Sequence, residues 1–285
     1  MRRVRLDAFP DSPRDNRGEA FSSDLTDMAD VSVEQVAPEQ FAAQADDIVA
    51  TIQNGIDQAK RNGTPMREAV MQARQSAHEA YVEQEENPEL RRFSELLFSV
   101  PRIVENARQL RLLEEQASQG LVAESKRDEF RARTRQGVED NHALREVVRE
   151  SSRSIGKEML IRWLERMGDP TGSVMKQRVT SVAAEIATAK ALESLPEVRS
   201  VAFGSVEDDL RGKDMFVLTR DGRAVPVDVK YGKFGDGVKK ASGGRIEIGI
   251  DTRNLYGFEL RPEKQHDLLQ SFRRAARLND RYRGR

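Results

Sequence analysis

The chain contains no cysteine and only three histidines among its 285 residues. The lack of cysteine excludes disulfide frameworks, thiol nucleophiles and thiolate metal sites. His78, His142 and His266 are far apart in the sequence and lack the paired spacing of metal ligands. No apolar run approaches the roughly 18–20 residues of a membrane span, and the basic start leads into Asp, Pro and Ser instead of an apolar signal segment. We therefore expect a soluble, cytoplasmic protein, located in the host cytoplasm if its source is a virus.

The net charge of −1 conceals an uneven distribution of charge along the chain. Residues 1–150 carry 21 Lys and Arg against 29 Asp and Glu, whereas residues 151–285 carry 26 against 19. A basic half joined to an acidic half predicts that the C-terminal half contacts a polyanion. The alternative is a chance imbalance between two surfaces.

The N-terminal half divides into an arm and a helical region. Residues 1–37 have few large apolar side chains, so we expect a flexible arm there. From residue 38 to 169 the apolar residues recur at three- and four-residue steps, which predicts an all-helical domain for recognition, dimerisation or partner docking. Expected helices cover 38–61, a segment from Thr64, a segment from Pro88, about 121–136, and 139–167. Thr64 should cap the second of these, and Pro101 should kink or split the third.

The pattern changes after Pro170. A helix is expected over 173–195, followed by short β-branched runs at 198–203, 213–219, 224–231 and 246–250, and by a final helix over 262–279. Asp221-Gly222 lies between the second and third runs and predicts a hairpin. The expected fold is α+β, with the helical domain followed at residues 170–285 by an α/β domain whose small mixed central sheet is flanked by helices.

Three charged residues are expected to converge at one end of this hairpin. Because side chains alternate along a strand, Asp228 and Lys230 share one face, while Val227 and its neighbouring valines enter the core. Asp214 begins the adjacent strand. Two carboxylates and an ammonium at one point suit Mg²⁺, which is held by one or two carboxylates plus water and substrate phosphates. The alternative is a cross-strand salt bridge on a solvated sheet face.

This segment resembles the PD-(D/E)xK nuclease superfamily, which includes type II restriction enzymes and Holliday-junction resolvases. The resemblance covers about residues 173–280 and implies a restriction-endonuclease-like domain. It implies that Asp214, Asp228 and the carbonyl of Val229 bind the metal, and that Lys230 activates water. Glu185, in the preceding helix, would be the carboxylate that assists the metal or the lysine.

The sequence departs from the superfamily pattern in three places. Lys213 stands where the superfamily name has a proline, and Pro226 lies inside the proposed strand, where proline favours an edge or a strand start. The Gln-x-x-x-Tyr of the RecB-like branch is missing, because Leu269 stands four residues after Gln265.

The resemblance implies a Mg²⁺-dependent endonuclease, with Mn²⁺ as a substitute, that hydrolyses duplex or branched DNA by metal-assisted attack of water. It implies no nucleotide cofactor and no membrane partner, and homodimerisation is one role open to the helical domain. The alternatives are a non-catalytic nucleic-acid-binding module that retains the fold, and a structural or interaction protein of a phage or mobile element. The intact set of Asp214, Asp228 and Lys230 argues against the first alternative.

Two basic segments are candidates for contacts with DNA. Residues 231–245 contain five glycines and four basic residues, so they could follow a phosphate backbone; a solvated hairpin loop is the alternative. The C-terminal helix and tail add a second basic stripe. Asp208 and Asp209 either support the site or belong to a polar loop, and the loop is the favoured interpretation. The candidate DNA-binding residues are Lys233, Lys239, Lys240, Arg245, Arg273, Arg274 and Arg277.

Overall fold

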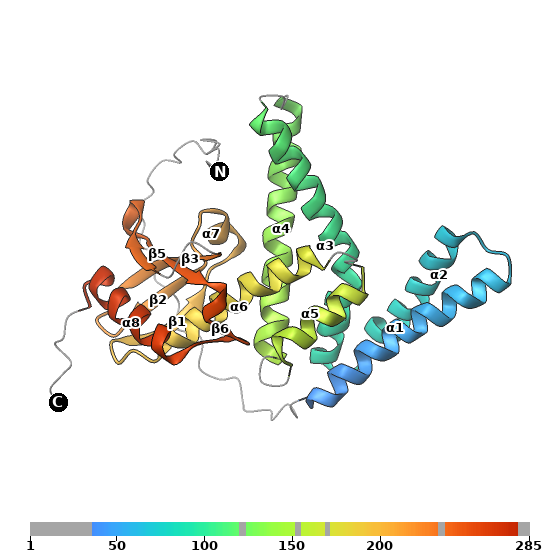
Figure 1. The fold of residues 1–285 in the computed structure, drawn as a ribbon, viewed down its shortest axis with the longest axis horizontal. Coiled ribbons are helices and arrows are strands. Elements are labelled where there is room, and N and C mark those ends of the chain that lie inside the picture. The colour runs from blue at the N-terminus through green and yellow to red at the C-terminus, as the bar shows by residue number, and fades with distance from the viewer. Residues whose placement is uncertain (1–35, 120–123, 152–154, 169–171, 233–236, 279–285) are drawn as a thin grey trace.

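A computed structural model describes residues 36–119, 124–151, 155–168, 172–232 and 237–278 (Figure 1). The predicted arm therefore lies outside the described residues except for Val36 and Ala37, and Val36 is buried in the helical core. No helix within the described ranges combines the length and apolar character needed to cross a membrane.

The first half of the described chain is helical, as predicted. It consists of α1 (Pro38–Arg61), α2 (Met66–His78) with a π-helical turn (Glu79–Glu83), α3 (Pro88–Ser118), α4 (Glu124–Ser151) and α5 (Lys157–Arg166). Across the residues described before Val198 there is no strand, which confirms the expected confinement of the sheet to the second half. A T-shaped contact between Phe93 and Trp163 lies in the core of this region.

Four of the predicted helix boundaries are wrong. The single helix expected over 139–167 is divided between α4 and α5, since Ile155 and Gly156 are not helical. The N-cap of α2 is Pro65, and Thr64 lies one residue before it. The α3 helix is not split at Pro101, because Val100 and Ile103 are buried on either side and their packing outweighs the lost backbone hydrogen bond. The predicted break near residue 137 is absent: α4 is continuous there, and the Gly137 carbonyl accepts a hydrogen bond from Arg178 at 2.9 Å.

The second half forms a mixed sheet with helices packed on it. After α6 (Ser173–Glu193), the five-stranded sheet has the order β1-β2-β3-β5-β4, in which only β3 and β5 pair in parallel. This confirms the α+β fold. The strands are β1 (Val198–Phe203), β2 (Met215–Thr219), β3 (Ala224–Gly232), β4 (Gly237–Lys240) and β5 (Ile246–Asp251). A short helix, α7 (Val206–Leu210), precedes β2; the two-residue strands β6 (Leu255–Tyr256) and β7 (Glu259–Leu260) precede α8 (Pro262–Ala276).

Two features of the second half differ from the expectation. Asp208 and Asp209 belong to the helix α7 instead of a polar loop, and β4 occupies part of the segment expected to be a glycine-rich loop. The hairpin between β2 and β3 is as predicted. Pro226 pairs with β2, whereas β5 begins to pair only at Val227, so the proline lies where β3 has a neighbour on one side only.

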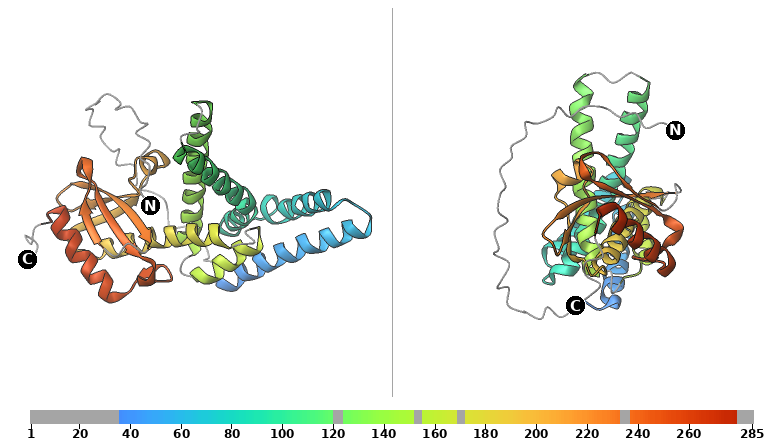
Figure 2. Two further views of the ribbon diagram at one scale, coloured as in Figure 1. Left: turned by 45° about the horizontal axis from the view of Figure 1, so that its top comes forward. Right: turned by 90° about the vertical axis from the view of Figure 1, so that its left-hand side faces the viewer.

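The helix α6 belongs to both halves of the molecule. Val179 and Val182 pack in the core of the N-terminal helices, whereas Ala184 and Leu192 pack with the valines of β3 and with Phe272 of α8. In Figures 1 and 2, α4 crosses α6 beside α7, and α3 and α4 extend past α7 as an antiparallel pair. Through its contacts with both halves, α6 thus places α4 beside the end of the sheet at which α7 lies.

Candidate metal centre

The predicted Asp and Lys residues lie together at the end of the β2–β3 hairpin. Asp228 is 2% exposed, and its Oδ1 lies 2.5 Å from Nζ of Lys230, so these two side chains share one face as expected. Asp214 directly precedes β2, and its Oδ2 accepts a hydrogen bond from the Val229 amide at 2.5 Å. Backbone pairing holds this geometry, since the Asp214 amide donates to the Val227 carbonyl at 2.9 Å.

Arg245, predicted as a DNA contact on an exposed loop, lies against this centre instead. Its Nη1 lies 3.7 Å from Oδ2 of Asp228 and donates to the carbonyls of Arg211 and Gly212 at 3.1 and 3.0 Å. Gly212 has a φ of +71°, and a Cβ there would lie 2.4 Å from Nη1 of Arg245. Glycine is thus required where the chain bends around the guanidinium.

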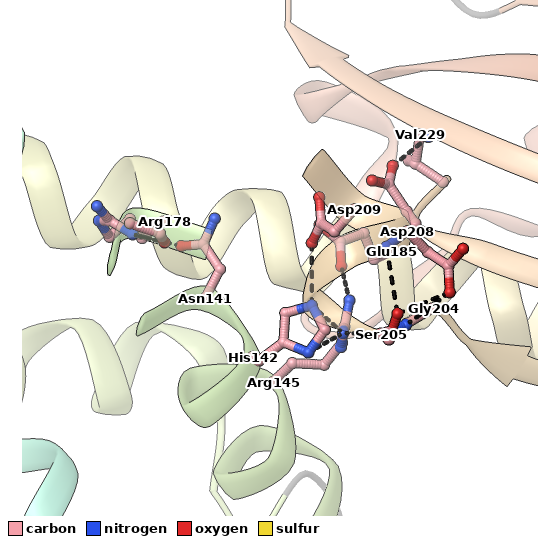
Figure 3. Close-up of polar contacts among 12 residues, drawn as sticks. Asn141, His142, Arg145, Arg178, Glu185, Gly204, Ser205, Asp208, Asp209 and Val229 are labelled. Carbon is pink, nitrogen blue, oxygen red and sulfur yellow. Dashed lines mark hydrogen bonds and ion pairs between the residues drawn. The ribbon is translucent and has the colours of Figure 1, made fainter. Parts of the chain in front are cut away.

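Glu185 reaches the same region from α6 and pairs with an arginine of the helical half. Nη1 of Arg145, in α4, donates to Oε2 of Glu185 at 2.9 Å, and both side chains are buried (Figure 3). The Arg145 guanidinium also lies 4.7 Å from the ring centroid of Phe203, a cation–π contact. The helical half therefore supplies the counter-ion of a predicted site residue.

His142 extends this network to α7. Its ring lies 3.0 Å from Nη2 of Arg145, and its Nε2 lies 3.2 Å from Oδ2 of Asp209 (Figure 3). One neutral tautomer satisfies both contacts, with Nδ1 accepting from Arg145 and Nε2–H donating to Asp209. Burial, followed by the charge of Arg145, lowers the pKa of His142, which favours that neutral form.

Sequence reasoning missed Arg145 and His142 and placed Asp209 in a loop. A signal existed for Arg145, because it stands between Leu144 and Val147, which belong to the helical core. A lone arginine in such a run requires a buried partner. The partner itself lies 40 residues away, so local sequence does not identify it.

Two carboxyl groups of this centre, Asp214 and Glu185, have a raised pKa. Burial raises the pKa of Asp214 to about 8; the charges of Glu185, Asp228 and Asp209 add to the rise, and the Val229 hydrogen bond opposes it. Burial also raises the pKa of Glu185, while Arg145 opposes that shift. The centre therefore concentrates negative charge that is poorly solvated, an arrangement that a bound cation relieves.

The raised pKa of Asp214 predicts that the stability of the metal-free protein depends on pH. Because the pKa of Asp214 rises from near 4 in the unfolded chain to about 8, the folded state holds more protons between these values. Its contribution to the free energy of unfolding should therefore fall as pH rises through this window, by about 1.4 kcal/mol per pH unit at mid-range.

Asp214→Asn should remove this contribution, so denaturant unfolding at pH 5, 6 and 7 should show a shallower fall with pH than in the unsubstituted protein. Asp57→Asn serves as the control, because the Asp57 side chain on α1 is 46% exposed and pairs with Lys60 at 3.8 Å. Parallel pH profiles for all three proteins would contradict the buried, mutually repelling carboxylates described above.

The residues present fit a hard divalent cation. Oδ1 of Asp228 is buried and makes no hydrogen bond of ordinary geometry with any described residue, although the Lys230 ammonium is adjacent. With Asp214, it offers the one or two carboxylates that Mg²⁺ takes together with water and phosphate oxygens. The described residues do not contain three or more His, Asp or Glu side chains already gathered into a metal-binding group. The two carboxylates thus fit a metal site whose remaining ligands are oxygens of water and substrate.

The remaining predicted DNA-binding residues are dispersed. Lys239 and Lys240 lie on β4; Lys239 is 71% exposed and pairs with Glu247 at 2.8 Å. Arg273 of α8 is paired with Glu197 at 3.1 Å, whereas Arg274 and Arg277 are exposed. Lys233 lies outside the described residues. The structure does not bring α8 to the carboxylate centre.

Comparisons with family models, with curated proteins and with solved structures found no match to this chain. The candidate site is thus defined by its own geometry: three carboxylates and a lysine from α6, from the residue before β2 and from β3, bordered by α4.

Proposed function

We propose that the protein is a Mg²⁺-dependent endonuclease that hydrolyses phosphodiester bonds of DNA in the cytoplasm. The observation that carries this proposal is the pairing of Asp228 with Lys230 beside the buried Asp214. A buried carboxylate pair next to an ammonium is poorly suited to stabilising a fold, because each buried charge costs desolvation energy. It is well suited to holding a cation and a phosphate. A restriction-endonuclease-like arrangement of α6, the mixed sheet and α8 is part of the proposal.

The residues have distinct roles in this proposal. Asp214 and Asp228, with the Val229 carbonyl, would hold Mg²⁺, or Mn²⁺ in its place, which polarises the phosphate and lowers the pKa of bound water. Lys230 would orient the attacking water, help to remove its proton and neutralise charge that develops on the phosphate. Glu185, fixed by Arg145, would assist the metal or the lysine.

A second candidate is a DNA-binding module without catalysis. The Glu185–Arg145 and Asp228–Lys230 ion pairs favour it, because a network of paired charges is also what a structural polar cluster looks like. The two candidates differ in one respect: only the nuclease should cleave DNA, and its cleavage should require a divalent cation.

Cleavage is tested on supercoiled plasmid, a four-way junction and single strands, each with Mg²⁺ and with EDTA. We expect nicking or linearisation of at least one duplex or branched substrate with Mg²⁺ and none with EDTA. Mg²⁺ should also raise the thermal midpoint in the absence of DNA, because it binds only the folded site. DNA binding without cleavage on any substrate would favour the second candidate.

A further inference from the structure

Basic side chains gather on one face of α4. At 3.6 residues per turn, six side chains fall within a sector of about 80°. No acidic residue between positions 127 and 149 falls inside this sector. We call this set the arginine face; it consists of Arg127, Arg131, Arg135, His142, Arg145 and Arg149.

Contacts of the inner residues show where the arginine face points. Arg145 bonds to Glu185 at 2.9 Å, and His142 to Asp209 at 3.2 Å. About two turns before His142 on α4, Nη1 of Arg135 pairs with Glu207 of α7 at 3.0 Å. The arginine face is therefore turned toward α7 and the carboxylate centre, which Figure 3 shows for His142 and Arg145.

The outer residues continue this face beyond α7. Arg127 and Arg131 are exposed, and the pair of α3 and α4 extends past α7 in Figure 1. Arg131 lies 3.3 Å from Asp128 of its own helix, an exposed pair that a phosphate could replace at little cost. Beyond Arg135, which pairs with Glu207 of α7, α4 thus carries two further arginines that face solvent.

From these positions we propose that the outer arginine face, Arg127 and Arg131, binds the phosphate backbone of duplex DNA next to the carboxylate centre. The inference rests on the proposed function and names a second substrate-binding surface for it. Arg127 and Arg145 are separated by about 27 Å along the helix, at 1.5 Å per residue. That distance is the axial rise of about eight base pairs of DNA, at 3.4 Å each.

A linear polyanion fits this surface better than an acidic protein does. Arg127, Arg131 and Arg135 follow one another at four-residue steps, about 6 Å each, along one line, and a guanidinium fork matches a phosphate in geometry. Because such contacts go to phosphates, they should hold the duplex in position without reading its sequence.

The test is the salt dependence of duplex binding, measured with Ca²⁺ so that binding is followed without turnover. Each phosphate contact contributes about −0.9 to the slope of log K against log[salt]. Arg127→Ala/Arg131→Ala should therefore flatten the slope by up to about 1.8, equally on unrelated DNA sequences. The control is Arg61→Ala/Arg67→Ala on α1 and α2, which removes the same charge from exposed positions on the far side of α3 (Figure 1). The slope of this control should change less than the slope of the Arg127/Arg131 variant.

The outcomes separate this inference from the proposed function. Equal slopes for the Arg127/Arg131 variant and the unsubstituted protein would overturn the inference even if Mg²⁺-dependent cleavage is observed. A flattened slope in a protein that binds DNA but never cleaves it would support the inference and overturn the nuclease. Tighter binding to duplex RNA than to duplex DNA would contradict the substrate named here.

Discussion

Lys230→Gln is expected to slow DNA cleavage by about 10²–10⁴-fold, the range lost when a positioned group that transfers a proton is removed. The variant keeps a polar side chain that is one atom shorter and loses the charge and acid–base function of the ammonium. The fold should tolerate it, because the Lys230 side chain is 44% exposed and not part of the core. Single-turnover cleavage of labelled DNA with saturating Mg²⁺ measures the effect.

The matched control is Lys190→Gln. Lys190 lies on α6 and, like Lys230, forms an ion pair, with Glu259 at 3.9 Å, but it is not one of the residues of the carboxylate centre. Its cleavage rate should stay within about twofold of the unsubstituted rate, since exposed pairs contribute little. If Lys230→Gln cleaved as fast as Lys190→Gln, the water-activating role of Lys230 would be wrong.

Arg145→Ala is expected to destabilise the protein by about 3–5 kcal/mol, the usual cost of removing one partner from a buried ion pair. The substitution leaves the Glu185 carboxylate buried without its counter-ion, next to Asp214 and Asp209. It also removes the contacts of the guanidinium with His142 and Phe203. Denaturant unfolding at pH 7 measures the loss.

Two comparison variants distinguish a buried pair from a general weakening of α4. Arg135 lies on the same helix as Arg145, and Arg135→Ala breaks its exposed pair with Glu207 of α7. This substitution should cost no more than about 1 kcal/mol. Adding Glu185→Gln to Arg145→Ala should recover part of the lost stability, because the unpaired charge is then removed. Equal losses for Arg135→Ala and Arg145→Ala, without recovery in the double variant, would show that the Arg145–Glu185 pair does not hold the two halves together.

The sequence predicted most of the framework that positions the site. The β1 boundaries and the hairpin at Asp221-Gly222 are confirmed, because alternation and turn residues are local signals. The placement of Asp228 and Lys230 on one face also followed from strand alternation alone. By contrast, α7 and β4 are only five and four residues long and carry no periodic pattern of their own.

The part of the site that comes from α4 could not be predicted in the same way. Arg145 and His142 act through contacts with Glu185 and Asp209, which lie 40 and 67 residues further along the chain. These contacts depend on how α4 packs across α6, and that packing is set by core residues of two helices instead of by a motif. Arg245 was misplaced for a related reason, since its contact with Asp228 requires the parallel pairing of β3 with β5.

The most direct test of the central claim is one plasmid assay with three reactions, run at equal protein concentration. These are the unsubstituted protein with Mg²⁺, the same protein with EDTA, and Lys230→Gln with Mg²⁺. Metal-assisted hydrolysis at the carboxylate centre predicts that supercoiled plasmid is cut in the first reaction and remains intact in the other two. Cutting of equal extent with EDTA, or by Lys230→Gln, would contradict the assignment of a metal-dependent nuclease site to Asp214, Asp228 and Lys230.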